Sequence, residues 1–128
     1  MQTIIMIDIN TLTYIDLKNV VKISRGSNDK MYTYLKQFSE LISERSKKVK
    51  ESMVAEDRTA MLQILHNMSP QIQFFGIHDV AESLKRMEWD YKTISIDKLK
   101  PIVEDILQKL NDAVDEVENI LDNNYPRA

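Results

Sequence analysis

His66 stands out in this sequence as a side chain that can act as a nucleophile. It lies within the 20 residues from Thr59 to His78, which contain no Asp, Glu, Lys or Arg although 29% of the chain is charged. A neutral imidazole has a nucleophilic ring nitrogen at pH 7, and no neighbouring carboxylate is present to repel an incoming anion. The pattern therefore suits the transfer of an anionic group, such as a phosphoryl group, to His66.

Helical spacing places His66 on the outer face of the helix that carries it. With about 100° per residue, the buried stripe comprises Met61, Ile64, Leu65, Met68, Ile72 and Phe75. His66 falls at about 140° from Met61, near three polar residues that can hydrogen-bond the imidazole or a phosphoryl group, Gln63, Ser69 and Gln73. The rest of this uncharged surface, which can dock another protein, is formed by Leu62, Asn67 and Pro70.

Two neighbouring residues are interpreted as structural. Gly76 is expected either just beyond the end of the helix or at a point of close packing. His78 is interpreted as a surface or capping residue near the start of the next helix. The chain has no cysteine and no Glu-x-x-His pair of the kind that holds a di-iron centre. No metal site is therefore predicted.

The elements that position these residues are expected to be helices. The chain has two glycines and three prolines, and apolar residues recur every three or four positions in four segments. We predict helices over about 29–53, 56–75, 79–91 and 99–121, preceded by a short helix over about 14–23. Residues 3–9 can form a short extended arm. The predicted fold class is therefore all-α. Because the connections are short, neighbouring helices are expected to be antiparallel, which gives an antiparallel up-and-down four-helix bundle with a short extra N-terminal helix.

Length and composition exclude several classes of protein. The 128 residues suit one domain, 1–128, with a core over about 12–123. The net charge is −3 without a basic patch, which argues against nucleic acid as a partner. No apolar run approaches the roughly 18 residues that span a membrane, and the N-terminus lacks the features of a signal peptide. We therefore expect a cytoplasmic, monomeric protein without a membrane partner.

His66 is followed by Met68 two residues later and by Gly76 ten residues later. This pattern resembles the motif of the histidine-containing phosphotransfer (Hpt) domains of two-component phosphorelays, which has a Gly ten residues after its His. Met68 replaces the family's Leu conservatively. Further similarities over roughly residues 12–121 are the turn Ile23-Ser24-Arg25-Gly26-Ser27, the helix residues Tyr34, Leu35 and Phe38, Asp57, Leu84 and the pair Met87-Glu88.

Two positions depart from the family pattern. The family's Lys three residues after the His is Ser69 in this chain, and the following Gly is Pro70. In the family, the Lys helps to hold the phosphoryl group and the Gly keeps bulk away from the imidazole. Pro70 also removes the N–H that would bond the His66 carbonyl, so a kink or a loosened turn is expected just after His66.

The resemblance implies a phosphoryl carrier on His66 without its own ATP-dependent kinase activity. Nε2 of His66 would attack the phosphorus of an aspartyl-phosphate on a response-regulator receiver domain, and the group would then pass to the Asp of a second receiver. No cofactor is implied for this chain, since Mg²⁺ would come with the receiver. The implied partners are receiver domains and a histidine kinase or hybrid kinase.

Two other interpretations stay open. An Hpt-like module can dock a receiver or a histidine kinase without turnover, and the departures at Ser69 and Pro70 favour this alternative. A plain helical adaptor, in which the spacing from His66 to Gly76 is a coincidence, is the third. A buried His66 would exclude the first two interpretations.

Overall fold

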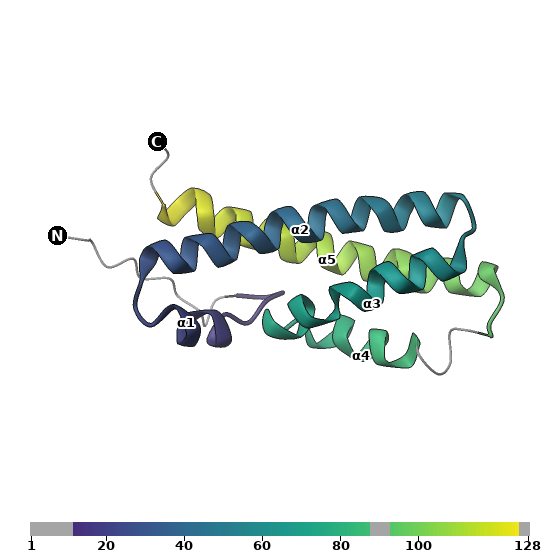
Figure 1. The fold of residues 1–128 in the computed structure, drawn as a ribbon, viewed down its shortest axis with the longest axis horizontal. Helices are drawn as coiled ribbons and strands as arrows, with labels where there is room; N and C mark the ends of the chain where they lie inside the picture. Colours follow the sequence, from purple (N-terminus) through teal and green to yellow (C-terminus); the bar gives the residue numbers. More distant parts are fainter. Residues whose placement is uncertain (1–11, 88–92, 126–128) are drawn as a thin grey trace.

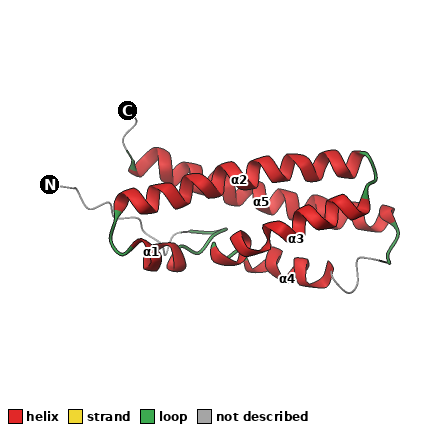
Figure 2. Ribbon diagram, viewed as in Figure 1, coloured by secondary structure: helices red, strands yellow, loops and turns green. Residues whose placement is uncertain are grey.

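The computed structural model describes residues 12–87 and 93–125, and within these ranges it contains helices and no strand. The helices are α1 (Lys18–Ser24), α2 (Asn28–Val54), α3 (Arg58–Phe74), α4 (His78–Met87) and α5 (Ile96–Asn124) (Figures 1 and 2). The all-α class predicted from the sequence is confirmed. The arm predicted at residues 3–9 lies outside the described residues.

The four later helices enclose one hydrophobic core. α2 packs against α3 and α5, while α4 packs against the same two helices. Figure 1 shows α4 turning back along α3 after a short connection. In this core, the rings of Phe38 from α2 and Phe75 at the end of α3 stack with 4.1 Å between their centroids. Other large side chains that are almost completely buried include Leu17, Met61, Leu65, Met68, Leu99, Ile106 and Leu110.

Side-chain caps fix where three of the helices begin. The side chains of Ser27, Asp57 and Ser95 accept backbone N–H bonds from Lys30, Ala60 and Lys98 at the starts of α2, α3 and α5. Each cap satisfies one of the backbone donors that a helix start leaves without a partner. Ser and Asp are among the residue types that most often cap helix starts.

The first helix begins later than the sequence predicted. A start near Tyr14 was expected, whereas α1 begins at Lys18. The backbone N–H groups of Thr13, Tyr14 and Ile15 donate instead to the Glu116 carboxylate of α5, at 2.9, 2.9 and 3.1 Å. A carboxylate that accepts three successive N–H groups holds this segment in a non-helical conformation. The prediction failed because this contact joins residues about 100 positions apart in the chain.

None of the described helices combines the length and the apolar character needed to cross a lipid bilayer.

Candidate functional site

α3 presents a buried stripe and an exposed face, and His66 lies on the exposed one. Met61, Leu65, Met68 and Ile72 are completely buried. His66 is exposed near the middle of the helix, with Gln63, Asn67, Pro70 and Gln73 also exposed and Leu62 and Ser69 half-buried. The side chain that could act as a nucleophile is thus accessible from solvent, and its candidate neighbours lie around it.

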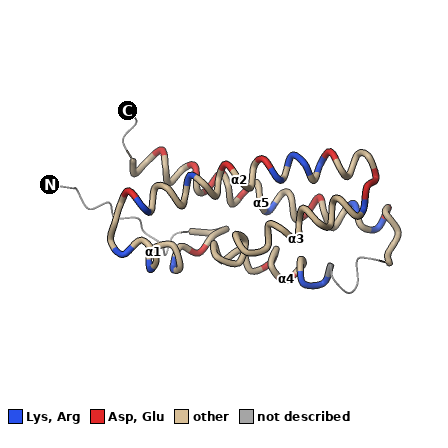
Figure 3. Tube along the Cα trace, in the orientation of Figure 1, with Lys and Arg blue, Asp and Glu red and all other residues tan. Residues whose placement is uncertain are grey.

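The exposed face of α3 is uncharged beyond its first residue. Arg58 starts the helix, and every residue from Thr59 to Phe74 lacks a charged carboxylate, ammonium or guanidinium group. Figure 3 shows the contrast, because α3 is almost entirely tan whereas α2 and α5 carry alternating red and blue positions. An anion that approaches His66 therefore meets no like charge on α3.

The polar side chains around His66 hydrogen-bond to one another. Gln63 Nε2 donates to Asn67 Oδ1 at 3.1 Å, and Gln73 Nε2 donates to Ser69 Oγ at 3.1 Å. Both pairs are four residues apart, and helical spacing places His66 between them. The structure thus brings together all four of these predicted site residues, but it joins them as two neutral pairs that flank the histidine.

Pro70 does not interrupt α3. The helix continues to Phe74 although Pro70 has no N–H to bond the His66 carbonyl. A residue of α2 bonds the backbone of the turn that contains His66, because Arg45 donates from Nη1 to the neighbouring Asn67 carbonyl at 3.1 Å. The kink or loosened turn that we expected does not break the helix, and a side chain of the adjacent helix holds the backbone beside His66.

Gly76 is required by the backbone at the end of α3. Its φ of +67° is in the left-handed region, and a Cβ at this position would lie 2.5 Å from the Cβ of Asp16. Asp16 also donates its backbone N–H to the Phe75 carbonyl at 2.8 Å. Both structural interpretations of Gly76 are therefore met, since it follows the helix end and allows the N-terminal segment to approach closely.

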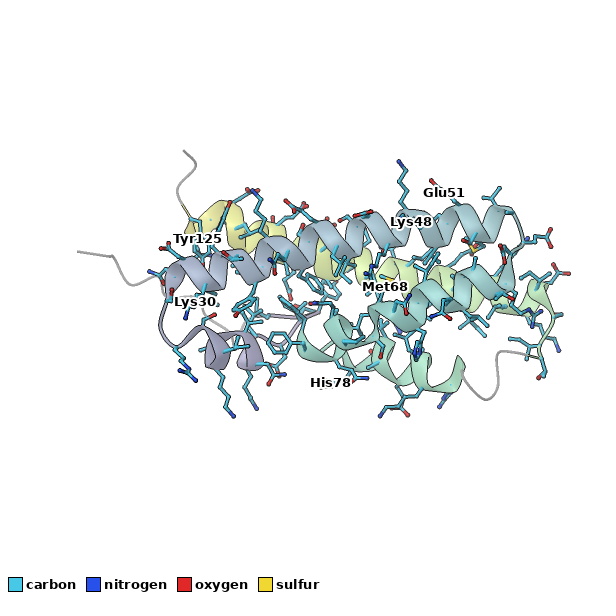
Figure 4. The ribbon with its side chains drawn as sticks, in the orientation of Figure 1. Lys30, Lys48, Glu51, Met68, His78 and Tyr125 are labelled. Atoms are coloured by element: carbon cyan, nitrogen blue, oxygen red, sulfur yellow. The ribbon has the colours of Figure 1, made fainter. Side chains whose placement is uncertain are left out.

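The second histidine lies apart from this surface. His78 is exposed and is the first residue of α4, and Figure 4 shows it on the side of the molecule away from α2. Among the described residues, no three His, Asp or Glu side chains are grouped so that they could hold a metal ion. Of the residues that carry the resemblance, Leu84 is buried, whereas Glu88 lies outside the described residues.

Two residues of this region were not identified from the sequence, Arg45 and Asp16. Arg45 lies 22 positions before the carbonyl that it bonds, and Asp16 contacts a glycine 60 positions later. Helical periodicity gives the face on which a residue lies, but it does not give the partner helix that this face meets. No local signal in the sequence could have assigned either contact.

Searches of protein-family models, of curated proteins and of solved structures found no match to this chain.

Proposed function

We propose that this chain is a histidine phosphotransfer protein of a phosphorelay, in which His66 carries a phosphoryl group between receiver-domain aspartates. We also propose that α2 to α5 form the antiparallel up-and-down four-helix bundle of the Hpt domains that the sequence resembles, with α1 as an additional N-terminal helix. The observation that carries the proposal is the exposure of His66 at mid-helix on an uncharged face. A carrier histidine must reach a phosphorus atom bound in another protein, so it has to be exposed rather than buried in a cleft.

The proposed step is an in-line phosphoryl transfer. The lone pair of Nε2 forms an N–P bond as the P–O bond to the aspartyl carboxyl breaks, and the electron pair of that bond leaves with the aspartate carboxylate. Nδ1 carries the imidazole proton, which the charged product can release to water. The reverse reaction with the Asp of a second receiver completes the transfer.

The proposed partners follow from what this chain does not supply. Phosphoryl transfer is catalysed mainly by positioning and by charge stabilisation, and we propose that the receiver brings the acidic pocket and the Mg²⁺. The neutral surface of Leu62, Asn67 and Pro70 would contact the receiver around His66. A cytoplasmic monomer that receives its group from a receiver or a hybrid kinase fits this role.

Incubation with phosphorylated receivers and Mg²⁺ tests this proposal. The expected result is an acid-labile, base-stable label on the wild-type chain that disappears in His66→Gln, while receiver binding is retained. The matched control is His78→Gln, which removes the other histidine and should keep the label. A label that persists in His66→Gln, or wild-type chain that no receiver labels, would contradict a carrier role.

A non-catalytic docking module is the second candidate. It is favoured by Ser69, whose hydroxyl accepts a hydrogen bond from Gln73 and brings no charge to the position where the resemblance expects a Lys. Such a module binds receivers without accepting a label, and His66→Gln leaves its affinity unchanged.

A further inference from the structure

We infer that Lys85 of α4 is the cation that pairs with the phosphoryl group on His66. This inference rests on the proposed function, because it assigns a partner to the group that His66 would carry. A phosphoryl group adds between one and two negative charges at neutral pH. From Thr59 to its end at Phe74, α3 offers no cation to that group, so any stabilising charge from this chain has to come from a neighbouring helix.

The hydrogen bonds between helices show which flank of α3 faces which neighbour. Arg45 of α2 bonds the Asn67 carbonyl, so the flank of α3 that carries Asn67 faces α2. With the buried stripe at about 0°, Asn67 falls at about 240° and His66 at about 140°. His66 therefore lies on the opposite flank, which faces α4.

A second bond confirms the order of the helices around the core. On α2, Arg45 lies on the flank toward α3, while Ser39 lies on the other flank and donates to Glu118 of α5 at 3.0 Å. α3 and α5 are the neighbours of both α2 and α4. The two contacts therefore determine whether α2, α3, α4 and α5 follow one another clockwise or anticlockwise around the core. The right-handed rotation of α4 then determines which of its flanks faces α3.

On α4, the flank that faces α3 carries Lys85. The buried residues Val80 and Leu84 define the inner side. With Val80 at zero, Ala81 falls at about 100° and Lys85 at about 140°, on the flank toward α3. Arg86 falls at about 240°, on the flank toward α5. Ala81 is half-buried, and its small side chain leaves little bulk between Lys85 and α3.

Lys85 and His66 also lie at the same height along the helix pair. His66 precedes the last residue of α3, Phe74, by eight positions, and Lys85 follows the first residue of α4, His78, by seven. At 1.5 Å per residue, these positions are about 12 Å and about 10 Å from the connection between the helices. Because α4 turns back along α3 (Figure 1), the two exposed side chains lie at the same height along the two helices. The flexible lysine stem lets its ammonium group reach toward the histidine.

Cysteine cross-linking tests the placement without any phosphoryl donor. The chain contains no cysteine, so His66→Cys combined with Lys85→Cys gives one reactive pair. The matched control combines His66→Cys with Arg86→Cys, since Arg86 is the next residue and is also exposed. A short bis-maleimide should link the first pair at least tenfold faster than the second, as measured by intact mass. Equal rates for the two pairs would overturn the assignment of Lys85 to this flank.

Labelling of His66 by phosphoramidate, a small donor that releases ammonia as the N–P bond to the histidine forms, tests the role of the charge without a receiver. Lys85→Gln should slow labelling about fivefold to tenfold, Lys85→Arg should restore most of the rate, and Arg86→Gln should stay within twofold of wild type. If the wild-type chain is labelled, and Lys85→Gln and Arg86→Gln are labelled at equal rates, this inference is overturned but the proposed function is not. Wild-type chain that accepts no group from phosphoramidate or from any receiver would overturn the proposed function together with this inference.

Discussion

α5 and the C-terminal end of α3 both bond the N-terminal segment, but by different means. α5 uses a charge, since the Glu116 carboxylate accepts the backbone N–H groups of residues 13–15. α3 uses neutral backbone groups, since the carbonyls of Phe74 and Phe75 accept bonds from Asn19 and Asp16. The outer faces differ in the same way, because α5 exposes Glu104, Asp105, Asp115, Glu118 and Asp122 whereas the exposed face of α3 beyond Arg58 has no charge.

This difference shows that the neutral face of α3 is not a requirement of helix packing. α5 buries a continuous apolar stripe with charged residues on its outer side, which is the usual arrangement of an amphipathic helix. α3 buries an equivalent stripe and could carry charges outside it equally well. The proposed transfer of an anionic group to His66 from a docked partner would account for a surface that lacks charge around this exposed histidine.

The largest effect is expected where α3 meets the N-terminal segment. Gly76→Ala should lower the free energy of unfolding by about 3 kcal/mol, because it adds both a left-handed strain and a steric overlap with Asp16. Gly26→Ala is the matched control, since Gly26 also has a positive φ but has open space around it. It should cost about 1 kcal/mol. Equal losses in urea denaturation would show that the close approach to Asp16 contributes nothing.

Removal of the charge that α5 uses should have the next largest effect. Glu116→Ala leaves three backbone N–H groups without their acceptor, and we expect a loss of about 2 kcal/mol in the free energy of unfolding. Asp115→Ala removes a neighbouring exposed carboxylate and should change stability by less than about 0.5 kcal/mol. Hydrogen exchange of the Tyr14 and Ile15 amides should accelerate only in Glu116→Ala. Unchanged exchange there would contradict the role given to Glu116.

A carboxylate placed on α3 should remove the contrast between the two helices. Gln63→Glu puts a negative charge one turn before His66, and the repulsion should slow phosphoryl transfer from a receiver by about tenfold, or roughly 1.4 kcal/mol. Gln108→Glu on α5 is closely matched, because Gln108 bonds Asp112 four residues later as Gln63 bonds Asn67. It should leave transfer within twofold of wild type. The same rate in both variants would mean that the neutral face of α3 has no electrostatic role.

The smallest effect is expected at the end of α5. Burial, and then the nearby Asp29 carboxylate, raise the pKa of Tyr125 above its usual value of 10.0. The folded state thus retains the phenol proton at pH values where the unfolded chain loses it, so the free energy of unfolding should fall as pH rises above 10. Tyr125→Phe keeps the ring and removes a buried hydroxyl that has no hydrogen-bond partner among the described residues. It should gain less than about 1 kcal/mol at pH 7 and show a weaker loss of stability above pH 10. An unchanged alkaline dependence in thermal melts would rule out this effect.

The fold was predictable where the signals are local. The predicted helices over about 29–53 and 99–121 match α2 and α5 within a few residues, because each combines a long apolar stripe with a serine cap. The start of α1 was predicted incorrectly because Glu116, far along the chain, holds the preceding residues in another conformation. Local patterns cannot report an acceptor that only the folded chain provides.

The candidate site was predictable in its face but not in its neighbours. The spacing of apolar residues was enough to place His66 on the outer side of its helix, where it is exposed. The contact of Arg45 with the Asn67 carbonyl, and the flank of α4 that meets α3, depend on the order of the helices around the core. That order is a property of the packed chain, and periodicity alone is compatible with either a clockwise or an anticlockwise order of the helices.

The location of the transferred group tests the central claim most directly. After incubation with phosphorylated receivers and Mg²⁺, the phosphoryl group should map by phosphopeptide mass spectrometry at neutral pH to His66, and it should survive in His78→Gln but not in His66→Gln. A group found on any other residue, or an unlabelled chain under conditions in which the receivers remain phosphorylated and bound, would contradict the account.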